Sequence, residues 1–367
     1  MSDKDERTSV QTEGAHGGRA EAQGVVFPVR LTSNENRTGL PEIVRRAIVE
    51  AFHDANLYPD DSAVELTEAL ARRHDVSFDA VVHGHGSTDL LRMAVPALAV
   101  GNPSIRLIMA DPTFEQLLRY SEPYDARVEH VPLVPGSWAH DVDAMARAAG
   151  AEDSPALVYI CNPNNPTGTL TPVHPVKEWI EGDRSSNRLF VVDEAYHEFV
   201  EDPSYESLAS WAVERPNVVV LRTFSKIFAM AGVRVGYAVA HPDTASRLKA
   251  FKSGRGPNHL GNRAALAALA DPGLLRDARQ LNREAREIVY GVLAELDLEA
   301  MESHTNFVMH EVGGDVRRYV ERMAEAGFQV GRPFEAFPTH NRISLGRPEE
   351  MEAWALTLRD FRARGWV

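Results

Sequence analysis

A lysine set among hydroxyl residues and followed by an arginine is the feature of this sequence that points most directly to chemistry. Lys226 ends the segment 223–226, which reads Thr-Phe-Ser-Lys, and Arg234 lies just before an apolar run. A lysine amine can form a Schiff base with a carbonyl cofactor. Hydroxyl and guanidinium groups suit the phosphate of pyridoxal phosphate. A plain polar turn is the alternative, so the hypothesis requires the rest of such a site elsewhere in the chain.

A glycine-containing turn is a candidate site for that phosphate. The segment 84–89, Gly-His-Gly-Ser-Thr-Asp, follows an expected strand and opens an expected helix. Backbone N–H groups at a helix N-terminus attract an anion, and Ser87 and Thr88 add hydroxyl donors next to Gly86. Asp89 replaces the third glycine of a dinucleotide fingerprint, and no lysine follows as in a Walker loop. Ordinary N-capping by Ser87 or Thr88 is the alternative.

Four further polar or aromatic residues follow apolar runs. Phe114 could stack on a planar ring, and Asn165 lies in a rigid loop with two Asn-Pro steps and could donate to a phenolate oxygen. Asp193 ends a buried run, where a carboxylate needs a positive partner such as a protonated pyridine nitrogen. Tyr196 could hydrogen-bond the same phenolate. A core phenylalanine, a plain turn and a helix N-cap at Asp193 are the respective alternatives.

Composition excludes several classes of function. The chain of 367 residues has a formal net charge of −14, which disfavours binding to nucleic acid or to an anionic membrane. The single cysteine, Cys161, rules out an intramolecular disulfide framework and fits a cytoplasmic location. No apolar run approaches the ~20 residues of a membrane span. His83 and His85 have the spacing that strand alternation gives by chance, so no metal site is predicted.

The pattern of apolar runs predicts an α/β fold. From about residue 80 to 240 short apolar strands alternate with helical patterns, as in a mostly parallel sheet covered by helices, and a smaller α+β domain follows. The expected strands of the sheet are 80–83, 105–109, 157–160, 189–192, 218–221 and 235–240. The second domain is expected to hold helices 262–269, 274–296 and 316–327 and strands 306–310 and 341–345. The expected division is a disordered leader 1–26, an N-terminal arm 27–57, a large domain 58–257 and a small domain 258–367.

Taken together, these motifs resemble the fold-type I pyridoxal-phosphate-dependent aminotransferases of class I/II, and most closely the histidinol-phosphate aminotransferase-like branch. The resemblance runs in collinear order from Leu31 to Gly346, and the order of the motifs makes it specific. Beside those already described, it rests on segments 31–36 (Leu-Thr-Ser-Asn-Glu-Asn), 58–60 (Tyr-Pro-Asp), 306–307 (Asn-Phe) and 342–346 (Arg-Ile-Ser-Leu-Gly).

The resemblance implies roles for individual residues. Lys226 is expected to form the internal aldimine and to carry out the 1,3-proton shift of transamination between a small-molecule amino donor and an oxo acceptor. Asp193 should pair with the pyridine nitrogen. The other expected cofactor-binding residues are Gly86, Ser87, Thr88, Phe114, Asn165, Tyr196, Thr223, Ser225 and Arg234. Tyr58 should reach the phosphate of a neighbouring subunit, which implies a homodimer with shared active sites. Substrate binding is expected from Arg342, Asn36, Arg37 and Arg332.

Two departures from the family pattern concern the substrate. Arg37 replaces the proline that usually follows Asn-Glu-Asn, and Gly331 stands where an arginine is usual, with Arg332 one place later. We therefore expect an amino acid or amino-alcohol phosphate other than histidinol phosphate as the substrate. A lyase or decarboxylating enzyme on the same scaffold is an alternative. A transcription regulator is a third, but residues 1–26 do not resemble a helix-turn-helix.

Overall fold

The apolar runs between residues 80 and 240 become neighbouring strands of one seven-stranded sheet. The strands from β7 to β4 are parallel, and β8 runs antiparallel to both of its neighbours. In spatial order they are β2 (Val81–Gly84), β8 (Gly236–Ala240), β7 (Val218–Thr223), β6 (Arg188–Asp193), β5 (Ala156–Cys161), β3 (Arg106–Asp111) and β4 (Arg127–Pro132). The predicted α/β class with a mostly parallel sheet is confirmed.

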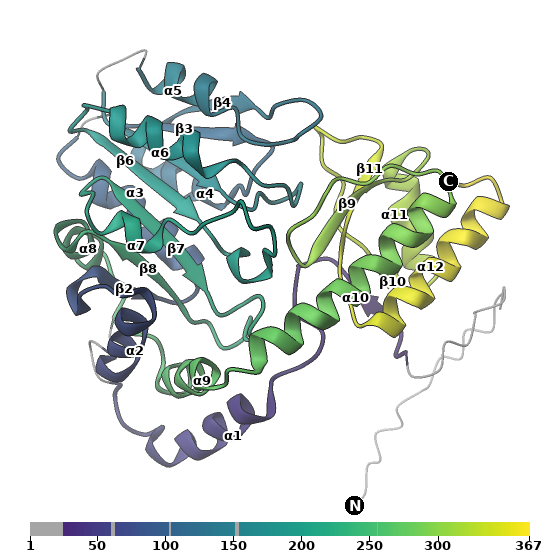
Figure 1. Cartoon of the computed structure of the whole chain (residues 1–367), viewed down its shortest axis with the longest axis horizontal. Helices are drawn as coiled ribbons and strands as arrows, with labels where there is room; N and C mark the ends of the chain where they lie inside the picture. The colour runs from purple at the N-terminus through teal and green to yellow at the C-terminus, as the bar shows by residue number, and fades with distance from the viewer. Residues whose placement is uncertain (1–24, 60–62, 103, 151–153, 255) are drawn as a thin grey trace, which may run out of the picture.

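The computed structural model describes residues 25–59, 63–102, 104–150, 154–254 and 256–367. The predicted leader lies outside these residues, except for Val25 and Val26. A large lobe built on the sheet and a smaller lobe lie side by side, and α10 (Leu274–Glu295) runs from one to the other (Figure 1). No helix of the described ranges is long and apolar enough to cross a membrane.

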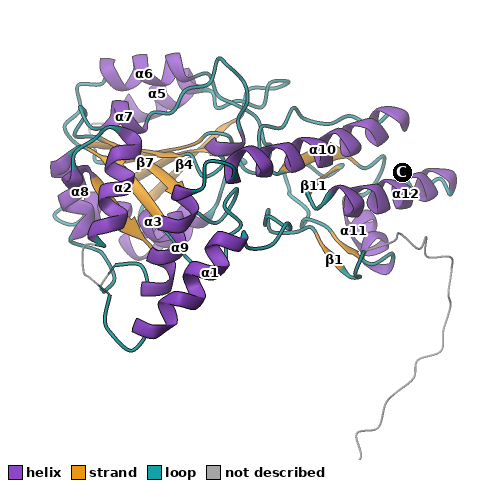
Figure 2. Cartoon of the chain, turned by 60° about the horizontal axis from the view of Figure 1, so that its bottom comes forward, coloured by secondary structure: helices purple, strands orange, loops and turns teal. Residues whose placement is uncertain are grey.

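Helices cover both faces of the sheet, which explains why its strands are apolar throughout (Figure 2). Along β5, Val158 and Ile160 enter the core on one face, and Leu157 and Tyr159 enter the core on the other. The first face is covered by α2 (Val64–His74), α5 (Val142–Gly150), α6 (Val173–Gly182), α7 (Ala209–Ala212) and α9 (His259–Ala270). The second face is covered by α3 (Ser87–Ala99), α4 (Gln116–Ser121) and α8 (Pro242–Lys249).

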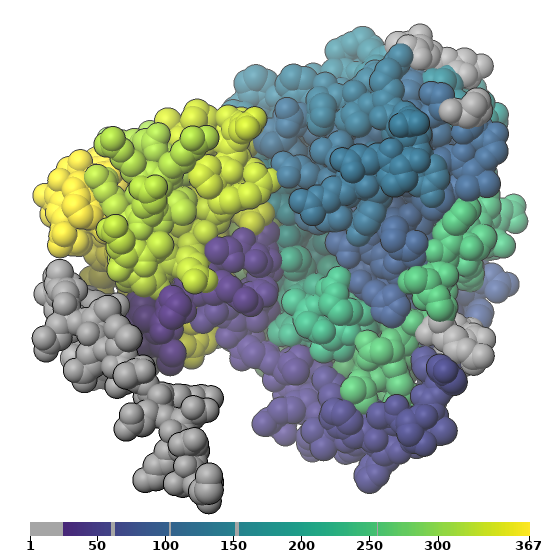
Figure 3. All heavy atoms as spheres, turned by 180° about the vertical axis from the view of Figure 1, so that it is seen from behind, coloured from purple at the N-terminus to yellow at the C-terminus, as the bar shows by residue number. Residues whose placement is uncertain are grey.

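The smaller lobe has its own core, to which the N-terminal segment contributes. β9 (Phe307–Glu311) pairs antiparallel with β11 (His340–Ser344), and β1 (Val29–Arg30) pairs parallel with β10 (Phe328–Gln329). The buried Trp354 of α12 (Pro348–Ala363) and side chains of α11 (Val316–Glu325) pack here with Val29 and Leu31. The N-terminal segment then passes between the lobes to α1 (Glu42–Ala51), as the space-filling view shows (Figure 3).

The position of α9 bears on where the domains divide. Ala264 and Ala265 of α9 pack into the core of the large sheet, although the sequence suggested a small domain from residue 258. Within α10, Leu274 still belongs to that core, whereas Val289 belongs to the core of the smaller lobe. We therefore propose that the division between the lobes falls inside α10.

Three elements differ from expectation for identifiable reasons. β4 was not anticipated, because half of its residues are polar and only one is fully buried. Helix α3 starts at Ser87 with Gly86 as its N-cap residue and no side-chain cap hydrogen bond, so N-capping by Ser87 or Thr88 does not explain this turn. α12 was also not anticipated, although Pro348 occupies the first helical position, where proline is favoured.

Candidate active site

A cavity of about 800 Å³ lies between the lobes, at the carboxyl ends of β5, β6 and β7. Ligands bind at this edge in open α/β sheets, because the loops that leave the strands converge there. The cavity gathers most of the residues predicted from the sequence. Those that line it are Ser87, Thr88, Phe114, Asn165, Asp193, Tyr196, Thr223, Ser225, Lys226, Arg234, Arg332 and Arg342.

Lys226 presents its amine to the cavity without an ion-pair partner within 4 Å in the described chain. Its Nζ donates only long hydrogen bonds, of 3.4 Å to the Ser33 carbonyl and 3.3 Å to the Asn34 carbonyl. Burial lowers the pKa of Lys226 to about 8, and the positive charge of Arg342 acts in the same direction. An amine with such a pKa is partly neutral near physiological pH, which a nucleophilic lysine requires.

Asp193 ends β6 as a buried carboxylate that lines the same cavity. Oδ2 accepts a hydrogen bond of 3.0 Å from the Tyr159 hydroxyl, and Oδ1 accepts one of 3.2 Å from the Ala195 backbone. Burial raises the pKa of Asp193 to about 6, although the bond from Tyr159 opposes this shift. A buried cation next to this carboxylate would stabilise its ionised form.

Two donors face the cavity between these groups. The Asn165 amide oxygen accepts a 2.6 Å hydrogen bond from Arg342, which turns the amide nitrogen of Asn165 toward the remaining side as a donor. The Tyr196 hydroxyl accepts a 3.0 Å hydrogen bond from Asn34 Nδ2, so its own proton remains available for donation. The pair can therefore hold one anionic oxygen.

The far end of the cavity is an anion-binding turn. Arg234 donates to the Ser225 hydroxyl at 3.3 Å, to the Thr88 hydroxyl at 3.3 Å and to the carbonyl of residue 85 at 2.9 Å. These groups surround the N-terminus of α3, where backbone N–H groups point outward. Gly86 has a φ of +83°, and a Cβ there would lie 2.5 Å from the Arg234 guanidinium, so only glycine fits.

Arg342 of β11 closes the cavity from the smaller lobe. NH1 donates to Asn165 and NH2 donates to the Thr32 carbonyl at 2.7 Å, while buried Nε has no hydrogen-bond partner among the described residues. Burial lowers the pKa of Arg342, and nearby Arg332 contributes to that shift by repulsion. The guanidinium is thus held rigidly and has no carboxylate partner in the described part of the chain, as suits an anchor for an anionic ligand.

Four predicted residues do not line this cavity: Gly86, which lies behind Ser87 in the turn, and Asn36, Arg37 and Tyr58. Asn36 donates to the Ile227 carbonyl at 3.0 Å. Arg37 forms a two-pronged ion pair of 2.8 and 2.6 Å with the buried carboxylate of Glu350 in α12, so its charge is already engaged. Tyr58 is 85% exposed on the large lobe. The polar groups of Asn36 and Arg37 thus hold the N-terminal segment in place and do not point into the cavity.

The structure adds residues that the sequence did not single out. Asn34, rather than Asn36, reaches the cavity, because its φ of +53° turns the side chain toward Tyr196. Its backbone N–H and side-chain oxygen both bond the hydroxyl of Ser344 in the smaller lobe. Tyr159 supports Asp193 from within β5. In the sequence, Tyr159 could have been noticed because it carries a polar hydroxyl in an otherwise apolar strand.

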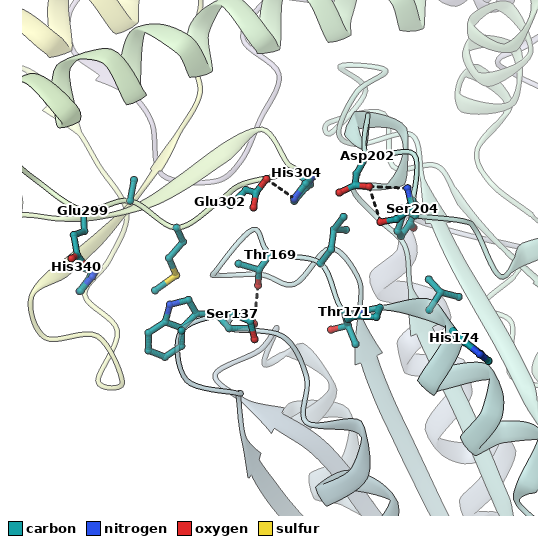
Figure 4. A pocket seen from close by; sticks show the side chains of 18 residues that line it. Ser137, Thr169, Thr171, His174, Asp202, Ser204, Glu299, Glu302, His304 and His340 are labelled. Carbon is teal, nitrogen blue, oxygen red and sulfur yellow. Dashed lines mark hydrogen bonds and ion pairs between the residues drawn. The ribbon is translucent and has the colours of Figure 1, made fainter.

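A second cavity, of about 660 Å³, contains none of the predicted site residues. Its lining includes residues 169–174 of the large lobe and residues 299–302, His304 and His340 of the smaller lobe, as Figure 4 shows from close by. Neither lysine nor arginine is among the lining residues. Across the described ranges, no group of three or more His, Cys, Asp and Glu residues could hold a metal ion.

The fold and the first cavity together define the class of protein, a fold-type I pyridoxal-phosphate enzyme. Comparison with known proteins identifies the family within this class. A family model described as aminotransferase class I and II matches residues 28–357. A histidinol-phosphate aminotransferase from Caldicellulosiruptor saccharolyticus is 32% identical over 88% of this chain and 88% of that protein. An aromatic amino acid aminotransferase from Thermobifida fusca is 35% identical over 91% of this chain and 90% of that protein.

A solved structure agrees with these relatives. The histidinol-phosphate aminotransferase from Sinorhizobium meliloti, in complex with pyridoxal-5'-phosphate, superposes with a TM-score of 0.84 at 27% identity, covering 95% of this chain and 96% of that chain. The chain belongs to the class I and II aminotransferase family. The cofactor expected from the sequence, pyridoxal phosphate, is thereby confirmed.

The chemical groups that line the cavity are those that this cofactor needs. It combines an amine of lowered pKa, a buried carboxylate that needs a cation, and donors for one anionic oxygen. At its far end the helix N-terminus, hydroxyls and Arg234 can accept a phosphate dianion. These groups match, in kind and in order, the carbonyl, ring nitrogen, phenolate and phosphate of pyridoxal phosphate.

Proposed function

We propose that this aminotransferase acts on amino acids, whose α-carboxylate binds Arg342. The observation that carries the proposal is the rigid Arg342 guanidinium, which shares one cavity with the Lys226 amine and has no carboxylate partner among the described residues. A planar guanidinium binds a carboxylate through two parallel hydrogen bonds. Relatives named for histidinol phosphate and for aromatic amino acids are similarly close, at 32% and 35% identity, so similarity does not select the substrate.

Each residue then has a task in transamination. When bound, pyridoxal phosphate supplies a ring that withdraws electrons from the substrate Cα. Lys226 would hold the cofactor covalently, and its amine would move the proton between the substrate Cα and the cofactor C4′. Asp193 would keep the pyridine nitrogen protonated. The remaining residues hold the cofactor: Tyr196 and Asn165 bind the ring oxygen, Phe114 stacks on the ring, and Gly86, Ser87, Thr88, Thr223, Ser225 and Arg234 bind the phosphate.

The test of this proposal is substitution of the lysine. In Lys226→Ala we expect turnover to fall by at least ~10³-fold, because both the covalent attachment and the proton transfer are lost. Borohydride treatment followed by peptide mass spectrometry should find the cofactor on Lys226 of the wild type. Lys249→Ala, in which the lost amine bonds only the Asp79 carbonyl of the large lobe, is the matched control. Covalent cofactor on another lysine would refute the assignment.

A screen of amino donors decides between transamination and the alternative activity, that of a lyase or a decarboxylating enzyme on the same scaffold. The purified protein should transfer an amino group from an amino acid to a 2-oxo acid, and without the acceptor no more than one equivalent of oxo product should form per active site. Release of ammonia or CO₂ without an acceptor would instead identify a lyase or a decarboxylating enzyme. Arg342→Gln should raise the KM for both substrates, because each loses its carboxylate partner.

We also propose that the working unit is a two-fold homodimer. Tyr58 is 85% exposed in the single chain, which is unusual for a tyrosine of a family motif unless another surface covers it. In a two-fold dimer the same residue of each subunit can reach the site of the other. Tyr58 would then complete the phosphate site of its neighbour.

A further inference from the structure

The segment before α1 places Asn34 where three parts of the chain meet. Asn34, Tyr196 and Ser344 come from the N-terminal segment, the large lobe and the smaller lobe, and all three are buried. The backbone at Asn34 has a φ of +53°, a left-handed conformation that asparagine tolerates better than most residues. Because these side chains are buried, each of their polar groups needs a partner among its protein neighbours or in the cavity.

The hydrogen bonds between Asn34 and Ser344 fix which end of the Asn34 amide faces which neighbour. The Asn34 backbone N–H donates to the Ser344 hydroxyl oxygen at 2.8 Å, and a backbone N–H can only donate. The hydroxyl hydrogen of Ser344 is therefore free to be donated, and Asn34 Oδ1 accepts it at 3.0 Å. With the amide turned over, Ser344 would face an NH2 group, and its own hydrogen would lose this acceptor.

The orientation of the Asn34 amide in turn orients the hydroxyl of Tyr196. Since Ser344 holds the amide oxygen, Asn34 presents Nδ2 to the Tyr196 hydroxyl at 3.0 Å. An amide NH2 can only donate, so the Tyr196 oxygen accepts this bond and its own hydrogen points away from Asn34. Tyr196 lines the cofactor cavity, which offers the remaining direction for that hydrogen.

Asn34 is also held through its carbonyl oxygen. That oxygen accepts hydrogen bonds of 3.0 Å from Asn306 Nδ2 and of 3.3 Å from Lys226 Nζ. Ser344 lies two positions after Arg342 on β11, and alternate residues of a strand share a face of the sheet. Asn34 therefore lies between the reacting amine and the strand that carries the proposed substrate anchor.

We propose that Asn34 and Ser344 are positioning residues that together hold the hydroxyl hydrogen of Tyr196 toward the ring oxygen of the cofactor. This inference rests on the proposed contact between Tyr196 and that oxygen. The negative charge of the ring oxygen favours a proton on the nitrogen that joins the cofactor to Lys226, and a hydrogen-bond donor held on the oxygen weakens this effect. The ordered Tyr196 hydrogen therefore lowers the pH at which that nitrogen loses its proton.

The absorbance of the cofactor-loaded enzyme as a function of pH is the measurement, because the bound cofactor absorbs at different wavelengths with and without that proton. In Ser344→Ala the Asn34 amide can turn and its oxygen can accept the Tyr196 hydrogen, so the midpoint should rise by about one pH unit. Asn34→Asp, whose ionised side chain can only accept, should raise the midpoint as well. Ser210→Ala, which loses a hydroxyl bonded to the His74 carbonyl, is the control and should keep the wild-type midpoint.

A Tyr196→Phe background shows whether these effects pass through the hydroxyl. There, neither Ser344→Ala nor Asn34→Asp should shift the midpoint further, because the group on which both residues act is gone. A further shift in that background, or an unchanged midpoint in either folded single variant, would overturn the inference and leave the proposed function intact. A wild-type midpoint in Tyr196→Phe itself would refute the contact on which the inference rests. Absence of transamination, with the midpoints shifted as expected, would refute the proposed function alone.

Discussion

At the residue scale, burial shifts the pKa values of two ionisable groups of the cofactor site, Lys226 and Asp193, in opposite directions. Burial lowers the pKa of Lys226 to about 8 and raises that of Asp193 to about 6. In both cases burial in the cavity disfavours the charged form of the side chain when no opposite charge lies next to it. A cofactor that is cationic at its ring nitrogen and electrophilic at its carbonyl carbon relieves both penalties. The polypeptide is thus adapted to the cofactor before the cofactor binds.

The first residue-scale prediction concerns pH. The Asp193 pKa of about 6 lies above the ordinary value of 3.8, so the carboxylate that pairs with the ring nitrogen is lost as pH falls through 6. Cofactor affinity should therefore decrease below that pH. Tyr159→Phe removes the hydrogen bond that lowers this pKa, and should move the loss of cofactor to higher pH.

Equilibrium binding of pyridoxal phosphate across this pH range is the measurement. Tyr124→Phe, at the surface of the large lobe, is the control and should keep the wild-type midpoint. Asp193→Asn should abolish the pH dependence and bind the cofactor at every pH as weakly as the wild type does well below pH 6. A midpoint that does not move in Tyr159→Phe would contradict the coupling between these two side chains.

At the scale of elements, the site depends on strand ends and helix ends that are fixed by close contacts. Arg222 of β7 is buried and bonds Glu194 at 2.8 Å and Glu198 at 2.9 Å, which ties β7 to the segment after β6. Asp193 and Thr223 end these two strands. Removing one partner of a buried ion pair is costly, on the order of 3–5 kcal/mol, so this network holds the strand ends in register.

The role of the turn before α3 in phosphate binding can be tested by a single substitution in β8. In β8, a Cβ at Gly236 would lie 2.5 Å from the backbone carbon of Gly86 and 2.6 Å from the nitrogen of Ser87. Gly236→Ala must therefore displace the start of α3, at a cost of ~1–3 kcal/mol. We expect a lower melting temperature and at least ~10-fold weaker cofactor binding, because the phosphate loses its helix N-terminus.

Gly182→Ala is the matched control for this substitution, since nothing lies within 4 Å of a Cβ at Gly182. It should retain the cofactor affinity and the melting temperature of the wild type. Normal cofactor binding by a folded Gly236→Ala protein would show that the phosphate is held without this turn.

At the scale of the whole molecule, the site exists only where three parts of the chain meet. The large lobe supplies Lys226 and Asp193, the smaller lobe supplies Arg342, and the N-terminal segment supplies Asn34 between them. The ion pair of Arg37 with Glu350 anchors that segment to the smaller lobe. Movement of one lobe relative to the other would therefore change the distance between the substrate anchor and the reacting amine.

The proposed dimer is tested at this scale by mixing inactive variants. Tyr58→Ala and Lys226→Ala should each form dimers with little activity. In a hybrid dimer one site receives both intact residues, one from each subunit, and the other site receives neither. Unfolding and refolding an equal mixture should restore about a quarter of wild-type activity, because half of the dimers are hybrids. Recovery of no activity, with hybrids present by mass spectrometry, would place Tyr58 outside the neighbouring site.

The sequence by itself determined the fold class and the chemistry of the cofactor site. Strands buried on both faces are continuous apolar runs, so the sheet could be recognised, and residues such as Lys226 and Asp193 follow those runs directly. Their position at one edge of the sheet is therefore a consequence of local sequence. The edge strand β4 was not predicted, because polar residues interrupt its apolar run.

Only the tertiary structure decided the substrate side of the site. Asn34 and Asn36 look equivalent in sequence, but the left-handed backbone at Asn34 sends one side chain to Tyr196 while the other bonds Ile227. Arg37 forms an ion pair with Glu350, and Arg332 forms one with Glu115, the residue before α4. These outcomes depend on how the two lobes and the N-terminal segment pack together. Such contacts join residues far apart in the chain, and no local pattern encodes them.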